Sequence, residues 1–127
     1  MPTSSTALMA VAKRTAPELA VESALRLSGC KFVSSRGKRL IHGADYIVHE
    51  LKAMIWVDGC YWHACEFGGP ESVRGTSGTV IRERDRRNRD EAQLAGWNTL
   101  RIWECNPIAP VVTSFIGGIR RSSGNKL

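Results

Sequence analysis

The sequence contains no run approaching the roughly 18 consecutive apolar residues of a membrane-spanning helix, so we predict neither a transmembrane segment nor a membrane partner. We expect no secretory signal either, because the first basic residues follow a short apolar run instead of preceding it, which makes a poor signal. Apolar residues are not depleted, at 43%, which excludes a fully disordered chain and a fibre. We therefore expect a soluble, cytoplasmic protein.

Acidic residues are few: 12 Asp and Glu stand against 18 Lys and Arg, a formal net charge of +6. This balance predicts an acidic partner, with nucleic acid as the first class to consider. The 127 residues suit one compact domain, and no internal repeat is evident. We expect this domain to span residues 15–116, between a flexible basic arm (1–14) and a flexible basic tail (117–127).

The only cysteines are at positions 30, 60, 65 and 105, and their spacing does not resemble the disulfide framework of a small secreted protein. In a reducing compartment such cysteines are more often metal ligands or core residues. Cys60 and Cys65 are close enough to share an ion, with Cys105 as a third ligand after folding. Composition alone leaves zinc binding and core burial both open.

Local patterns predict a helix followed by a β-hairpin. Thr15 and Glu18 have the spacing of a capping box, and Gly29 occupies the position that ends the helix. A short β-prone run, 31–34, precedes a basic turn, 35–39. Two apolar runs follow, separated by a polar turn at 49–52, and the second run is apolar throughout, as in a strand buried on both faces. These runs comprise residues 45–48 and 53–57.

The second half of the chain predicts a loop, a helix and a strand. Residues 66–78 are rich in glycine, 79–95 have helical character with mixed charges, and 98–103 alternate like a strand. A mixed sheet packed by helices follows from this order of elements. The expected fold class is therefore an α/β sandwich.

Two segments have residue types that suit catalysis. Asp45 begins a strand, where a carboxylate either binds Mg²⁺ as a hard oxygen ligand or simply terminates a turn. The segment Asp58–His63 gathers an acid, a thiol, two aromatic residues and an imidazole directly after a buried strand. His63 suits a general base near neutral pH. Tyr61 and Trp62 either fill the core or unstack DNA bases.

Other charged residues have simpler explanations beside functional ones. The capping box alone accounts for Glu18, and Asp85 has the context of an ion-pair partner on a solvated helix. The neighbouring arginines form either a solvated face or a phosphate-neutralising surface. These arginines are Arg84, Arg86 and Arg87. His42 and His49 lack a partner pattern and are predicted to be surface residues.

Five blocks in order resemble the very-short-patch-repair (Vsr-like) endonuclease family, across roughly residues 9 to 106. The blocks are Thr15–Ala20, Gly43–Val48, Val57–His63, Arg84-Asp85, and Gly96-Trp97 with Trp103–Cys105. The third block is the specific one. The resemblance implies a restriction-endonuclease-like fold of the PD-(D/E)xK class, a three-layer sandwich with a mixed central β-sheet flanked by helices.

The resemblance also implies roles for individual residues. Asp45 matches the metal-binding aspartate, and Val57 matches the residue whose backbone carbonyl lies near the Mg²⁺ ion. His63 matches the histidine that activates the attacking water. Glu18 and Asp85 match the acids that complete the catalytic set. Tyr61 and Trp62 match aromatic residues that insert beside the target base pair. In such an enzyme we expect the arginines of the second helix to hold flanking phosphates without reading sequence; these are Arg84, Arg86 and Arg87.

Family zinc sites use four ligands, of which Cys60, Cys65 and Cys105 match. The fourth, a histidine shortly after Cys65, is absent from residues 66–69, so Cys30, a histidine or a carboxylate would have to complete the site. The loop from 68 to 79 is shorter than in the family and lacks its additional tryptophan.

The implied function is a Mg²⁺-dependent endonuclease that nicks one strand of double-stranded DNA, with a thymine–guanine mismatch as the family substrate. We expect a monomer in a bacterial or phage setting. Three alternatives stay open: a nuclease of a homing, restriction or phage-defence system without mismatch specificity, a zinc-stabilised DNA-binding module that lacks catalysis, and a purely structural protein.

Overall fold

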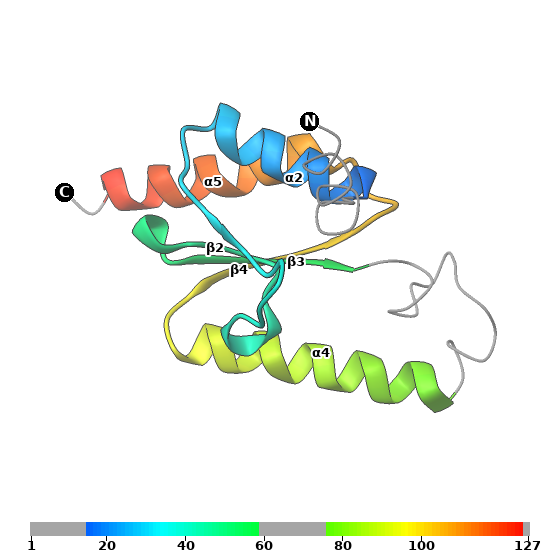
Figure 1. Cartoon of the computed structure of the whole chain (residues 1–127). Helices are drawn as coiled ribbons and strands as arrows, with labels where there is room; N and C mark the ends of the chain where they lie inside the picture. The colour runs from blue at the N-terminus through cyan, green and yellow to red at the C-terminus, as the bar shows by residue number, and fades with distance from the viewer. Residues whose placement is uncertain (1–14, 59–75, 126–127) are drawn as a thin grey trace.

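The computed structural model describes residues 15–58 and 76–125, which form three layers. Helices α2 (Ala16–Leu27) and α5 (Ile108–Asn125) cover one face of a central sheet, and α4 (Thr76–Leu94) lies on the other (Figure 1). The predicted three-layer α/β sandwich is therefore confirmed. No helix within these ranges is long and apolar enough to cross a lipid bilayer.

The sheet has four strands in sequential order and is mixed. The strands are β1 (Val33–Ser34), β2 (Tyr46–Val48), β3 (Ala53–Asp58) and β4 (Asn98–Trp103). Strands β1, β2 and β3 pair antiparallel, which confirms the predicted hairpin, whereas β3 and β4 pair parallel and are joined through α4. Short 3-10 turns, η1 (Ile41–Gly43) and η2 (His49–Leu51), flank β2.

Side chains of the inner strands alternate between two cores, as the two-residue period of a strand requires. Tyr46 and Ile55 pack with α2 and α5, whereas Ile47, Met54 and Trp56 form a smaller cluster with Ala92 of α4. Strand β3 is thus covered on both faces, and its continuous apolar run is explained.

Helix α2 begins and ends where the sequence predicts. The Thr15 hydroxyl accepts a hydrogen bond from the backbone N–H of Glu18 at 3.4 Å, and the Glu18 carboxylate accepts from the backbone N–H of Thr15 at 3.3 Å. At the other end, Gly29 follows the last turn with φ +73°, a conformation that side chains disfavour. The apolar stripe between these ends buries Val21 and Leu25.

The expected flexible tail is wrong over residues 117–125, which continue α5. No helix was predicted here, because Gly117 and Gly118 argue against one. The structure shows the reason: Ile108, Val112 and Ile116 recur every four residues and are buried against the sheet and α2, so packing outweighs glycine's low helix propensity.

Helix α4 also differs from the prediction, because it begins at Thr76 and not at residue 79. Three residues of the expected loop are therefore helical, and the remaining part of that loop lies outside the described residues. The predicted basic arm, 1–14, lies outside them as well.

A candidate active site at the carboxyl end of the central strand

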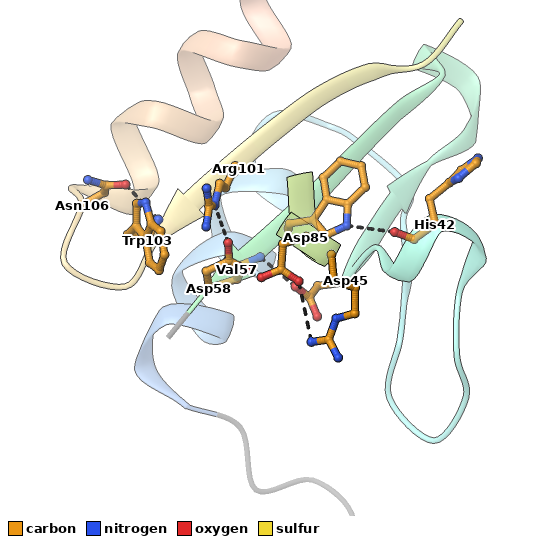
Figure 2. Close-up of polar contacts among 10 residues, drawn as sticks. His42, Asp45, Val57, Asp58, Asp85, Arg101, Trp103 and Asn106 are labelled. Carbon is orange, nitrogen blue, oxygen red and sulfur yellow. Dashed lines mark hydrogen bonds and ion pairs between the residues drawn. The ribbon is translucent and has the colours of Figure 1, made fainter. Parts of the chain in front are cut away.

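Asp45 is fixed at the point where β2 and β3 stop pairing. Its backbone N–H donates to the Ile55 carbonyl at 2.9 Å, and its carbonyl accepts from Ser35 at 2.9 Å. The next N–H along β3, that of Val57, donates to Asp45 Oδ2 at 2.7 Å (Figure 2). The half-buried carboxylate thus takes the place of a sheet partner, because the β2 backbone no longer reaches Val57.

The segment that precedes Asp45 is anchored to the α4 side of the sheet. The Trp56 indole N–H donates to the His42 carbonyl at 3.1 Å, so η1 is fixed to β3 (Figure 2). Gly43, with φ +66°, lies so close to α4 that a Cβ atom would be 3.2 Å from Asn88 Nδ2. These contacts fix the backbone two residues before the carboxylate. His42 is half-buried, unlike the predicted surface residue, and His49 is exposed as predicted.

Two cavities meet at Asp45, and acidic residues line both. The first, of about 270 Å³, includes Glu18 from α2 and Glu104 from the end of β4. The second, of about 310 Å³, includes Asp58 and Asp85. Because β3 and β4 run parallel, their carboxyl ends lie at one edge of the sheet, which places Asp58 and Glu104 at the same edge.

Glu18, predicted to be catalytic, shares the first cavity with Asp45. Its Oε1 atom also accepts hydrogen bonds from the N–H of Thr15 at 3.3 Å and from its hydroxyl at 2.9 Å. The capping interpretation is therefore confirmed, and it places the carboxylate beside Asp45 at the same time. The catalytic role stays a prediction.

Asp85 is the α4 residue that reaches the site. It is only 8% exposed, and its carboxylate points to the same side of the β3 end as that of Asp45 (Figure 2). Its ion pair with Arg84 is 3.8 Å long, and the Arg84 side chain is 62% exposed. Arg86 and Arg87 are also exposed. Helix α4 therefore turns an acid into the site and arginines toward solvent.

An ion pair that the sequence analysis did not identify closes the end of β3. Asp58 Oδ2 accepts from Arg101 Nε at 2.5 Å, and the Asp58 side chain is 4% exposed. The Arg101 guanidinium lies over the Trp103 ring, 4.1 Å from its centroid. In the parallel register Asp58 pairs with Trp103, so Arg101 lies diagonally across from it on the same face. The sequence alone does not give the register between β3 and β4, and for this reason it did not predict the ion pair between Asp58 and Arg101.

A second buried guanidinium lies on this side of the site. Burial lowers the pKa of Arg89, and repulsion from Arg101 lowers it further, whereas Asp58, Asp85 and Asp90 act in the opposite direction. Arg89 Nη1 and Arg101 Nη2 are buried and form no hydrogen bond within the part of the chain that the structure describes. The α4 side of the site is thus a dense cluster of opposite charges.

The residues around Asp45 fit a magnesium ion by their chemistry. Carboxylate oxygens are the ligands that Mg²⁺ prefers, and one or two of them with several waters usually suffice. In ranges 15–58 and 76–125 no three His, Cys, Asp or Glu residues are grouped as a metal site. The predicted role of the Val57 carbonyl is untested, although its N–H holds Asp45.

Of the three predicted zinc ligands, the structure describes one. Cys105 is exposed and lines a cavity with Ala16 and Pro17 at the start of α2, whereas Cys60 and Cys65 lie outside the described residues. Cys30 is buried beyond the other end of this helix. Twelve helical residues span about 18 Å, so Cys30 cannot join Cys105 as a ligand.

The remaining predicted residues follow β3 in the sequence and also lie outside the described ranges. These are Tyr61, Trp62 and His63. The described site therefore consists of Asp45, its neighbouring acids and the arginines of α4, and it presents the carboxyl end of β3 from which the Asp58–His63 block continues.

Comparison with known proteins agrees with this arrangement. A family model described as DNA mismatch endonuclease Vsr matches residues 3–68. The chain is 31% identical over 111 residues to the type II nicking enzyme V.NaeI of Lentzea aerocolonigenes, covering 80% of this chain and 67% of that protein. It is 29% identical over 99 residues to the type II nicking enzyme V.NmeAIP of Neisseria meningitidis, covering 73% and 70%.

A third relative is the DNA mismatch endonuclease Vsr of Escherichia coli, which is 34% identical over 68 residues, or 48% of this chain and 43% of that protein. The family model spans half of the chain, and the similarity to V.NaeI covers 80% of it. The chain therefore belongs to the Vsr family of DNA mismatch endonucleases.

Proposed function

We propose that this protein is a metal-dependent endonuclease that nicks one strand of duplex DNA. The observation that carries the proposal is the carboxylate of Asp45, held at 2.7 Å by the Val57 N–H between two acid-lined cavities. Family membership supports the reaction class, and two relatives are named as nicking enzymes.

The chain's own residues divide the work of hydrolysis. Mg²⁺, held by Asp45, would neutralise charge that develops on the scissile phosphate. His63 takes a proton from the attacking water. Glu18 and Asp85 flank Asp45 from α2 and α4, and the exposed arginines of α4 hold flanking phosphates without reading sequence.

Supercoiled plasmid provides the first test. Wild-type protein with Mg²⁺ or Mn²⁺ should produce open circles, and Asp45→Asn, which keeps the size of the side chain, should lower the rate by more than about a hundredfold. Glu50→Gln is the matched control, because Glu50 is an exposed acid in η2 at the opposite end of β3. His63→Ala should behave like the Asp45 variant.

Duplex binding by the same variants separates catalysis from recognition. Asp45→Asn should bind DNA nearly as well as wild type, because phosphate contacts provide most of the affinity. Nicking by this variant at the wild-type rate would show that the site is misassigned. If the wild-type protein binds duplex DNA but does not cut it in the presence of any divalent metal, the result would favour a DNA-binding module without catalysis.

The finer part of the proposal concerns the substrate. The family model is described as a DNA mismatch endonuclease, and we propose a thymine–guanine mismatch as the substrate, as the resemblance of the sequence implies. A panel of duplexes that differ only at one base pair should therefore show faster nicking of the mismatched members. Equal nicking of matched sites would favour a restriction, homing or phage-defence role.

Zinc is a separate part of the proposal. If Cys60, Cys65 and Cys105 hold a structural ion, a chelator should lower the melting temperature, because a metal bound only by the folded chain adds to its stability. Metal analysis of purified protein should detect zinc, and Cys105→Ser should contain less. Zinc-free protein with an unchanged melting temperature would contradict this part alone.

A further inference from the structure

The turn between β1 and η1 contains three cations to which the site described so far assigns no role. This segment, the basic turn, comprises residues 35–39 and includes Arg36, Lys38 and Arg39. Lys38 and Arg39 are exposed, and Arg36 is half-exposed. None of the three forms an ion pair with a residue of the described ranges.

The backbone of the basic turn is tied directly to that of Asp45. Ser35 donates its N–H to the Asp45 carbonyl at 2.9 Å, and Lys38 donates to the Ser35 carbonyl at 3.1 Å, which closes the turn. Gly37 has φ +74°, as the third residue of such a turn requires. The backbone that carries these cations is therefore fixed relative to that of Asp45.

Both cavities that meet at Asp45 have an arginine of the basic turn in their walls. Arg36 lines the first cavity, with Glu18 of α2. Arg39 lines the second, to which α4 contributes Arg84. Asp45 thus shares one cavity with Arg36 of the basic turn, and the other with Arg39 of the basic turn and Arg84 of α4.

Neutralising the neighbouring acids does not explain these cations. Within the described ranges Asp58 forms an ion pair with Arg101 and Asp85 with Arg84, and neither Arg36 nor Arg39 forms an ion pair. Exposed guanidinium groups beside cavities that hold a reacting phosphate match a ligand with regularly spaced negative charges. The sugar–phosphate backbone is that ligand when the substrate is DNA.

We propose that the basic turn is a second phosphate-binding element, which grips the DNA backbone next to Asp45 while α4 holds it from the other wall of the second cavity. Arg36 and Arg39 bind phosphates that flank the one at Asp45. This inference rests on the proposed function, and it adds residues from a different part of the chain to the DNA-binding surface.

Salt dependence of binding provides the test. In fluorescence anisotropy with a labelled duplex and no added divalent metal, the double variant Arg36→Gln/Arg39→Gln should bind at least about tenfold more weakly. The slope of log K against log salt should fall by about two, one for each lost phosphate contact. In nicking assays KM should rise while kcat changes less than about threefold. Arg36→Lys/Arg39→Lys should restore most of the affinity, because lysine keeps the charge.

A matched control removes the same net charge elsewhere. Lys31→Gln/Arg121→Gln changes two exposed cations, one in the segment after α2 and one on α5, and α5 covers the face of the sheet opposite α4. Its salt slope should stay within about half a unit of wild type. Equal weakening of both double variants, or an unchanged slope in the turn variant, would overturn the inference while wild-type binding and nicking still support the proposed function. Wild-type protein that neither binds nor nicks duplex DNA would overturn both.

Discussion

Among single residues, the Asp58–Arg101 pair has the largest predicted effect on stability. Both charges lie at the edge of the core, with the Asp58 side chain 4% exposed. Removing one partner of a buried pair leaves an uncompensated charge, so Arg101→Ala should lower the free energy of unfolding by about 3 kcal/mol. Urea denaturation followed by circular dichroism measures this change.

Two further variants show whether the loss of stability comes from the Asp58–Arg101 ion pair or from the packing of the Arg101 side chain. Arg84→Ala, which removes the 62% exposed partner of a 3.8 Å ion pair, should cost less than about 0.5 kcal/mol. Asp58→Asn combined with Arg101→Met should recover much of the loss, because neither member of the pair is then left as an uncompensated charge. If the double variant is as unstable as Arg101→Ala, lost packing of Arg101 on Trp103 explains the effect instead.

Burial also predicts a difference in reactivity between two cysteines. Burial raises the pKa of the Cys30 thiol, although the charge of Arg120 opposes this effect. A raised pKa means a smaller thiolate fraction at pH 8, and the thiolate is the reactive form. Iodoacetamide should therefore modify Cys30 at least about tenfold more slowly than exposed Cys105, as peptide mass spectrometry can measure. Equal rates in the folded protein would contradict the buried position.

At the scale of elements, Glu18 of α2 has both a structural role in the capping box and a proposed catalytic role. Thr15→Ala removes the hydroxyl that caps the helix and should lower the free energy of unfolding by about 1 kcal/mol. Glu18→Gln keeps a side chain that suits the capping box, so stability should change by less than about 0.5 kcal/mol, while nicking should fall. Thermal melts and plasmid nicking measure the two effects separately. A Glu18→Gln protein of unchanged activity would leave the residue with its capping role alone.

Elements defined by neighbouring residues were predictable, and those decided by distant contacts were not. The Thr15–Glu18 spacing and the polar turn at 49–52 were enough for α2 and the hairpin. Helix α5 contains Pro110 and two adjacent glycines, and only its packing against α2 and the sheet explains why it forms. Pro110 lies in the first turn, where its missing N–H is tolerated.

For the whole molecule, the site depends on one edge of the sheet. Asp45 was identified because a motif surrounds it in the sequence. Arg101 and Glu104 join the site through the parallel pairing of β3 with β4, and the basic turn joins through the Ser35–Asp45 hydrogen bond. These contacts connect segments that no local pattern relates, so the sequence indicated Asp45, Glu18 and Asp85 as site residues but not Arg101, Glu104 or the basic turn.

The C-terminal helix provides a prediction about the folded molecule as a unit. Arg120 of α5 donates to the Ser28 carbonyl at the end of α2 at 2.7 Å, and Ile119 packs against the larger core. A chain that ends at Ile116 loses both contacts and should be about 2–3 kcal/mol less stable, which lowers the melting temperature by about 10 °C.

A chain that ends at Ser122 is the matched control, because it keeps Ile119 and Arg120 and should lose about 0.5 kcal/mol or less through fraying. Arg120→Ala in the full chain then separates the hydrogen bond from the apolar packing. Equal melting temperatures for the two shortened proteins would mean that residues 117–122 contribute nothing, as expected of a flexible tail. If only the chain that ends at Ile116 has a much lower melting temperature than the full chain, α5 stabilises the position of α2. It would then also fix Glu18, which α2 carries on the face of the sheet opposite α4.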